Sequence, residues 1–225
     1  MFPQITPVTR NIIILNVIFF AATFLLTNIN LEPLLAGYFP LSPNFRSWQI
    51  VTHMFMHGSI MHIVFNMFTL YSFGPVLEQV LGQKKFIILY FAAGLGGFAL
   101  YNIWNYYEVS QLTSFLKSQA FDIHEIYKYA DNNYSGEMPI NSNSEAVRDA
   151  AQKLFVILKT PMVGASGAIC ALLGFVAYYD KAQRNGIITW ILLISVAPLI
   201  IGLPIAWYAH FIGLAVGFLY AIITK

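Results

Sequence analysis

Four polar residues that lie in otherwise apolar stretches have side chains able to do chemistry. They are His62, Asn66, Ser166 and His210. A serine hydroxyl becomes a nucleophile when a base removes its proton, and histidine is the usual base because its pKa lies near neutral pH. An asparagine amide or a second histidine can donate hydrogen bonds to an oxyanion. These residue types would suit acyl transfer if the fold brought them together.

Each of these residues also has a purely structural explanation. Ser166 lies among small residues in "TPMVGASGAIC" (160–170), where a serine most often serves close contact between helices. His210 could donate to a backbone carbonyl, and Asn66 could form a hydrogen bond between two helices. The arrangement of the elements that carry these residues is needed to distinguish a structural role from a catalytic one.

The composition identifies lipid as the solvent of much of the chain. The 225 residues are 58% hydrophobic and only 10% charged, whereas soluble domains are about a quarter charged. The net charge of +2 does not indicate nucleic-acid binding, and the single cysteine cannot form an internal disulfide. The start of the chain lacks the features of a cleavable signal peptide, so we expect a short tail before a retained first span.

Six segments are long and apolar enough to cross a membrane, which takes about 20 residues. They are residues 11–28, 58–77, 85–105, 164–180, 187–203 and 207–224. The sequence therefore predicts an all-α, polytopic membrane protein with six transmembrane helices in a single membrane domain.

Lysine and arginine residues predict the orientation of these spans. With a cytoplasmic N-terminus, the short inner loops carry Lys84, Lys85, Lys181 and Arg184, while the outer loop between the first two spans carries only Arg46. Both termini are therefore expected in the cytoplasm, and the second, fourth and sixth spans all run from the outside to the inside.

This topology places the four polar residues at one depth. At about 1.5 Å per residue, each lies within roughly 10 Å of the outer end of its helix, a coincidence that independent structural residues would not explain. We therefore predict one cluster in which Ser166 is the nucleophile and His210 the base. His62, Asn66 and the Ser166 backbone N–H would bind the oxyanion. Because no acidic residue lies at this depth in these spans, we expect a Ser–His dyad without an acidic orienting residue.

Small residues predict close contact between the fourth and sixth spans. On each span they share one helix face, which adjoins Ser166 on the fourth span and His210 on the sixth. The two stripes are Gly167, Ala171 and Gly174, and Gly213, Gly217 and Ala221. If the stripes face each other, the histidine can reach the serine.

Residues 106–159 differ from the rest of the chain and form an insertion outside the membrane. They hold most of the charges and a turn-rich centre, "ADNNYSGEMPINSNS" (130–144). Amphipathic patterns on both sides of this centre predict helices, the second of which begins after Ser144 as its N-cap. These helices either lie on the outer membrane surface or form a cap that screens partners or substrates.

Three motifs resemble the signatures of rhomboid intramembrane serine proteases. They are "THMFMHGSIMHIVFNM" (52–67), "GASGA" (164–168) and "AHFIGLAVGFLYA" (209–221), and "GPVLEQVLG" with Gly74 and Glu78 is similar to the family's end of the second span. The resemblance implies an endopeptidase that uses Ser166 and His210 to cleave peptide bonds in or next to transmembrane segments of membrane proteins, near the outer interface. It implies the same oxyanion site. We expect no cofactor and no metal.

The resemblance further implies a water-filled cavity that opens to the outside, in a multi-pass protein of a bacterial plasma (inner) membrane. It also implies that the fifth span or its loop moves to admit a transmembrane substrate. Pro198, Gly202 and Pro204 are compatible with a weak end to that span.

Two positions depart from the family pattern. The family's first outer loop often carries Trp-Arg, but this chain has Trp48-Gln49, with Arg46 two residues before Trp48. One turn after the serine the family often has an aromatic residue that packs on the catalytic histidine. This chain has Cys170 there, so the support of His210 must differ.

Other interpretations are less consistent with the sequence. His53, His57 and His62 could suggest a metal, but zinc sites use three or four protein ligands and no H-E-x-x-H motif is present. We expect His53 and His57 to organise the first outer loop instead. A non-catalytic protein that binds transmembrane helices would typically lack the nucleophile or the base. A transporter would need charged groups near mid-membrane and broken helices in repeated halves. The oligomeric state is not indicated.

Overall fold

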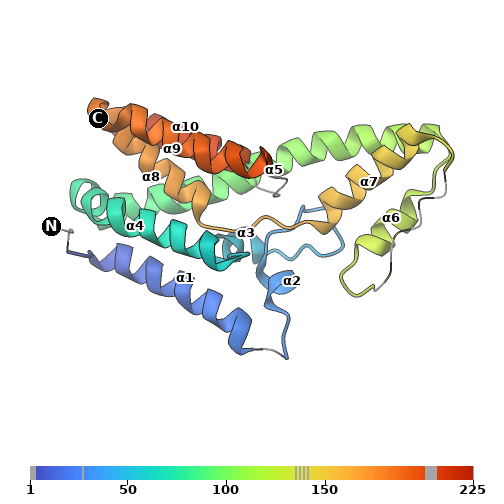
Figure 1. Ribbon diagram of the computed structural model, residues 1–225, viewed down its shortest axis with the longest axis horizontal. Coiled ribbons are helices and arrows are strands. Elements are labelled where there is room, and N and C mark those ends of the chain that lie inside the picture. The colour runs from blue at the N-terminus through green and yellow to red at the C-terminus, as the bar shows by residue number, and fades with distance from the viewer. Residues whose placement is uncertain are drawn as a thin grey trace.

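The computed structural model is a bundle of apolar helices with a smaller helical unit at one end (Figure 1). The structure describes residues 4–26, 28–134, 136, 138, 140, 142–200 and 207–224. Its elements are α1 (Pro7–Leu25), α2 (Leu31–Leu35), α3 (Gln49–Thr52), the 3₁₀ helix η1 (His53–Phe55), α4 (Ile60–Leu81), α5 (Gln83–Ser118), α6 (Ile123–Ala130), α7 (Glu145–Lys159), α8 (Ser166–Tyr179), α9 (Lys181–Ile200) and α10 (Trp207–Ile223). The two ends of the chain lie at one end of the bundle, and α6 and α7 lie at the other.

The lengths and composition of the helices agree with a membrane protein. Within the described part of the chain, α1, α4 and α5 are long and apolar enough to cross a membrane. The helix α8 and residues 209–223 of α10 are apolar but shorter. The predicted all-helical membrane bundle is confirmed.

The helix α8 lies at the centre of the bundle, where it contacts α4, α5, α9 and α10. Most of its residues are buried, as expected for a helix that is apolar on every side. Its contact with α10 is so close that a methyl group at Gly213 or Gly217 would collide with backbone carbonyl oxygens of α8. The small-residue stripes of the two helices therefore face each other.

The helix α5 does not end where the sequence predicts the third span to end, at residue 105. It continues as one helix of 36 residues to Ser118. Exposed aromatic side chains at Trp104, Tyr106 and Tyr107 are typical of a membrane–water interface. The distance along the helix from Lys84 to Trp104 is about 30 Å, the thickness of the hydrocarbon layer. The last turns of α5 therefore stand outside the apolar zone.

These last turns form a small unit with α6 and α7, which has its own apolar core. Six of its described core side chains are fully buried, namely Leu116, Ile126, Ala130, Ala151, Leu154 and Leu158. The apolar faces of α6 and α7 are thus covered by each other and by α5. These apolar faces therefore contact protein in the structure, and the location of α6 and α7 on the outer membrane surface stays a prediction.

Hydrogen bonds tie this unit to the loop between α1 and α4. Ser42 Oγ donates to the carbonyl of Leu158 at 2.6 Å, and Asn44 Nδ2 donates to the carbonyl of Ala130 at 2.8 Å. The backbone N–H of Asn132 donates to Asn44 Oδ1 at 2.9 Å. Because these donors and acceptors are largely buried, separating the unit from the loop would leave polar groups without partners.

At the opposite end of the bundle, a buried carboxylate joins α4 to the start of α1. Glu78 is only 3% exposed and accepts hydrogen bonds from the backbone N–H groups of Val8 and Thr9 at 3.0 and 2.8 Å. The hydroxyls of Thr6 and Thr9 also donate to it. The carboxylate thereby partners the free N–H groups of the first turn of α1, where a negative charge is also favoured by the helix dipole.

Replacing this carboxylate should weaken the bundle. In Glu78→Gln, one oxygen becomes an NH₂ group that cannot accept, so at least one buried donor loses its partner, at a cost of about 1–3 kcal/mol. We expect a lower apparent melting temperature in detergent micelles, whereas exposed Gln79→Ala should change it little. Equal melting temperatures for Glu78→Gln and wild type would contradict this role.

Candidate active site

The chain enters α8 through a tightly held turn. Gly37 and Met162 exchange two backbone hydrogen bonds at 2.9 and 2.8 Å, and the N–H of Gly164 donates to the carbonyl of His53 at 2.9 Å. Gly164 has φ +114°, a conformation that strongly favours glycine. A side chain there would also meet the His62 ring, since its Cβ would lie 2.8 Å from two ring atoms.

Ser166 is the first residue of α8, immediately after this turn. The first N–H groups of a helix have no partners within the helix, so the Ser166 amide stands among free donors at a positive helix end. The close contact between α8 and α10 brings the first turn of α10 beside it. There His210, only 6% exposed, places its Nε2 atom 2.9 Å from the Ser166 hydroxyl oxygen. This distance suits proton transfer from serine to histidine.

The other ring nitrogen of His210 contacts a residue that sequence reasoning missed. Nδ1 lies 2.9 Å from the hydroxyl oxygen of Ser195, a fully buried residue of α9. Serine is common in apolar helices, and a separation of 15 residues across a helix connection carries no periodic signal. Nothing in the sequence pattern distinguishes this serine, so only the three-dimensional structure identifies it.

His62 and Asn66 lie together on α4, beside the turn that precedes Ser166. A Cβ placed on Gly164 would lie 3.8 Å from Asn66 Nδ2, as well as against His62. Asn66 is 7% exposed, and its Nδ2 is a buried donor with no hydrogen-bond partner among the described residues. Such a group is costly unless an acceptor arrives, so the amide is suited to bind an oxygen that the protein itself does not supply.

Gln49 occupies the position where the first loop departs from the family pattern. Its side chain is fully buried. Nε2 donates to the carbonyls of Pro33 and Asn44 at 3.1 and 3.2 Å, while Oε1 accepts from the N–H of Arg46 at 3.0 Å. The indole N–H of Trp48 donates to the carbonyl of Leu34 at 2.8 Å. Glutamine therefore organises this loop with an uncharged amide.

His53 and His57 are buried parts of the same loop. His53 Nδ1 donates to the carbonyl of Gln49 at 2.9 Å, and its ring lies against Phe98 with the ring centres 4.8 Å apart. The His57 ring meets the His62 ring edge to face at 4.9 Å. Burial lowers the pKa of His53 to about 4 and that of His57 to about 4, the latter with a further contribution from His62. Both rings are therefore neutral at pH 7.

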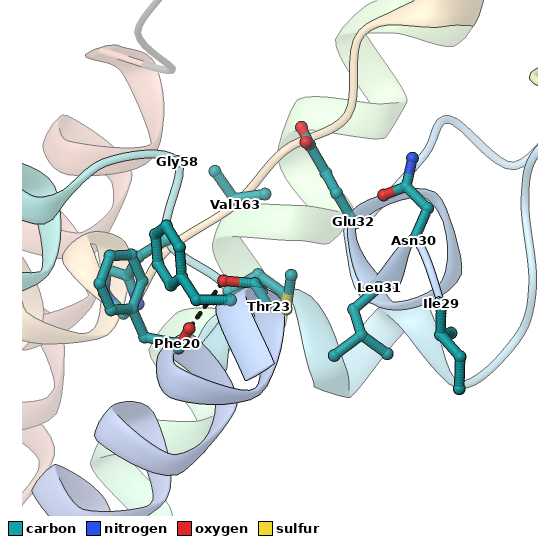
Figure 2. Close-up of a pocket in the computed structure, with 11 residues that line it drawn as sticks. Phe20, Thr23, Ile29, Asn30, Leu31, Glu32, Gly58 and Val163 are labelled. Atoms are coloured by element: carbon teal, nitrogen blue, oxygen red, sulfur yellow. Dashed lines mark hydrogen bonds between the residues drawn. The ribbon is translucent and has the colours of Figure 1, made fainter. Parts of the chain in front are cut away.

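A cavity of about 420 Å³ lies next to the site (Figure 2). Its walls come from the end of α1, the segment that leads into α2, the loop before α4 and Val163. It contains both apolar groups, such as Phe20, and polar ones, such as Glu32. His57, whose ring touches His62, also lines this cavity.

The structure describes only part of the end of the predicted fifth span. Gly202 and Pro204, expected to weaken the end of the fifth span, lie outside the described residues, while Pro198 lies within α9. Among the residues that the structure describes, no group of three or more His, Cys, Asp or Glu side chains could hold a metal ion.

The fold and the site define a class of protein: an integral membrane protein whose helical bundle encloses a serine–histidine pair. The family model of the Rhomboid domain matches residues 44–113 and 144–225, more than half of the chain. The chain belongs to the rhomboid family. The matched ranges include His62, Asn66, Ser166 and His210, and they leave out residues 114–143 of the additional helical unit.

Individual relatives match shorter stretches. Rhomboid-like protease 3 of Toxoplasma gondii is 37% identical over 62 residues, which are 28% of this chain and 24% of that protein. Rhomboid protease GlpG of Salmonella choleraesuis is 35% identical over 83 residues, 37% of this chain and 30% of that protein. Putative rhomboid protease YdcA of Bacillus subtilis is 32% identical over 50 residues, 22% of this chain and 25% of that protein. The chain thus spans between 24% and 30% of the length of these relatives.

The buried neutral histidines predict a loss of stability in acid. Above pH 6.5 they are neutral in both the folded and the unfolded chain. As the pH falls from 6.5 towards 4, the unfolded chain takes up protons that the folded protein excludes, which costs on the order of 3 kcal/mol for each histidine. We expect the apparent melting temperature in micelles to fall over this range.

The double variant His53→Phe/His57→Phe tests the cause of this loss. Its melting temperature at neutral pH is expected to be lower, since the Nδ1 hydrogen bonds are gone. Its decrease between about pH 7 and about pH 5 should nevertheless be smaller than in wild type. An equally steep decrease in the variant would show that other groups cause the acid sensitivity.

Proposed function

We propose that the protein is an intramembrane serine endopeptidase that cleaves peptide bonds in or next to transmembrane segments of membrane proteins. The observation that carries this proposal is the 2.9 Å contact between Ser166 Oγ and His210 Nε2, inside a helical bundle of the rhomboid family. Its relatives, which include proteins named rhomboid proteases, support the same activity.

The proposed reaction proceeds through an acyl-enzyme. Ser166 Oγ attacks the carbonyl carbon of the scissile bond while its proton moves to His210 Nε2. When the tetrahedral intermediate collapses, the C–N bond breaks and Nε2 returns the proton to the leaving amine. Water then attacks the ester carbonyl, again with Nε2 as the base, and Ser166 leaves as a hydroxyl. These reaction steps need no metal or other cofactor.

The negative oxygen of each tetrahedral intermediate needs hydrogen-bond donors. We assign this role to Asn66 Nδ2, the His62 ring and the Ser166 backbone N–H. The free, buried amide of Asn66 and its position beside Gly164 support the assignment. Donors that are fixed before the substrate arrives require little reorganisation as the charge develops.

The site lies at the end of the bundle where α4, α8 and α10 begin, the same end that carries the unit of α6 and α7 (Figure 1). With the lysine-rich connections of the opposite end in the cytoplasm, this end faces outward. We therefore place both termini in the cytoplasm of a bacterial cell, with cleavage near the outer interface of its plasma membrane. The cavity in Figure 2 is then positioned to receive a substrate side chain next to the scissile bond.

Removing the nucleophile tests the proposed function directly. Ser166→Ala should abolish cleavage of a single-pass membrane substrate and labelling by a fluorophosphonate probe, because it removes the hydroxyl that contacts His210 Nε2. Ser72→Ala, which removes a hydroxyl from α4 that bonds only its own helix, is the matched control. Cleavage by folded Ser166→Ala would contradict the mechanism, and His210→Ala should behave as Ser166→Ala does.

Removing the Asn66 amide tests the oxyanion assignment. Asn66→Ala should lower kcat by about 10²-fold if this amide is a principal donor, and Asn66→Asp should be at least as slow because a carboxylate repels the oxyanion. Asn102→Ala serves as the control, since that buried amide donates to its own helix. An unchanged kcat in Asn66→Ala would remove Asn66 from the site.

A further inference from the structure

The hydroxyl of Ser195 connects α9 to the proposed base. Its oxygen lies 2.6 Å from the carbonyl oxygen of Ile191 and 2.9 Å from His210 Nδ1. The first contact alone is ordinary, since serine in a helix often donates to the carbonyl four residues earlier. The second contact is not needed to give the serine hydroxyl a partner, because the Ile191 carbonyl already accepts its hydrogen. It engages Nδ1, the ring nitrogen of His210 that does not contact Ser166.

The chemistry of these atoms fixes the direction of every hydrogen bond. A carbonyl oxygen can only accept, so the single hydroxyl hydrogen of Ser195 is directed to Ile191. The oxygen of Ser195 must then accept the hydrogen on His210 Nδ1. In a neutral imidazole, a proton on Nδ1 leaves a lone pair on Nε2. This lone pair faces Ser166 Oγ at 2.9 Å and can accept its proton.

We propose that Ser195 is a positioning residue that holds His210 in the tautomer and ring orientation required of the base. This inference rests on the proposed function, because the base is the one assigned there. Ser195 thus takes the position of the acidic orienting residue of a triad, with a neutral hydroxyl in its place.

The surroundings of His210 explain why its support comes from α9. Cys170, which stands where the family often has an aromatic residue, has its Cβ 3.1 Å from the position of a Cβ at Gly213. It therefore faces the α10 backbone one turn beyond the histidine. A thiol that lies there fills space between the helices, and Ser195 provides the polar contact.

The contact should contribute more in the transition state than in the resting enzyme. When Nε2 takes up the proton, the ring becomes positively charged and Nδ1–H becomes a stronger donor. Hydrogen bonds to charged groups contribute more than neutral ones. An interaction that strengthens in the transition state raises kcat and leaves substrate binding nearly unchanged.

A matched pair of variants isolates the hydroxyl. Ser195→Thr keeps the hydroxyl and adds a methyl group. Ser195→Val introduces a side chain with the shape of threonine but without the hydroxyl. Relative to Ser195→Thr, we expect Ser195→Val to lower kcat by about 10- to 100-fold, with KM nearly unchanged. Ser195→Ala, which adds no bulk, should show the same loss relative to wild type, and it decides the matter if the larger side chains do not fit.

A spectroscopic measurement reports on the role directly and does not depend on activity. In micelles, ¹⁵N-labelled histidine distinguishes the two tautomers, and the His210 signal is assigned by its absence in His210→Gln. Wild type and Ser195→Thr should carry the proton on Nδ1, whereas Ser195→Val and Ser195→Ala should populate both tautomers.

The two measurements separate the possible failures. Equal kcat values for Ser195→Thr and Ser195→Val, or an unchanged tautomer in variants without the hydroxyl, would overturn the role of Ser195. A slower Ser195→Val with the tautomer of wild type would likewise overturn it, because the effect would then be structural. If wild type cleaves no membrane substrate, the proposed function fails, while the tautomer measurement still decides whether Ser195 positions the ring.

Discussion

The distance between α8 and α10 is the constraint on which the site depends. The proposed nucleophile belongs to one helix and the proposed base to the other, and both lie in the first turn. A hydrogen bond of 2.9 Å between their side chains leaves little room for error, since a displacement of about 1 Å in a catalytic geometry can cost 10²-fold in rate. The carbonyl oxygen of Ala171 fills the space that a side chain at Gly217 would need, so the helices are in backbone contact. The glycines of α10 are therefore needed for the proposed reaction, because they permit the close contact between the helices, although they take no part in the reaction.

The membrane setting imposes a second constraint, because buried polar groups must find partners within the protein. Glu78 is saturated by donors from the start of α1, and Gln49 by the backbone of its own loop. Asn66 differs from both, since its amide nitrogen is buried and free. A few other buried polar atoms also lack a partner among the described residues, such as His53 Nε2 and Asn105 Nδ2. Asn66 is distinguished by its position as well, because it lies beside the turn that precedes Ser166.

Much of the fold and part of the site could be predicted from the sequence, because lipid imposes long apolar runs and makes polar residues within them conspicuous. Ser166 and His210 stood out for this reason, and small-residue spacing indicated that their helices meet. Ser195 could not be predicted, since a hydroxyl in an apolar helix is unremarkable until its neighbour across the bundle is known. The length of α5 was also missed. Its apolar run ends near residue 105, but its backbone hydrogen bonds continue in water, where helix propensity and contact with α7 maintain them.

The uninterrupted course of α5 connects the helical unit of α6 and α7 to the bundle that carries Ser166. One side of the unit is the rigid extension of a membrane helix, and its other side, α7, ends at Lys159, only a short segment before Ser166. That segment is anchored to the first loop at Met162 and again at Gly164. The unit is thus joined to the bundle by a continuous helix, α5, on one side and by a hydrogen-bonded segment on the other. The unit is therefore connected on both sides to the turn that carries Ser166, so a displacement of α6 or α7 would be transmitted to the residue where α8 begins.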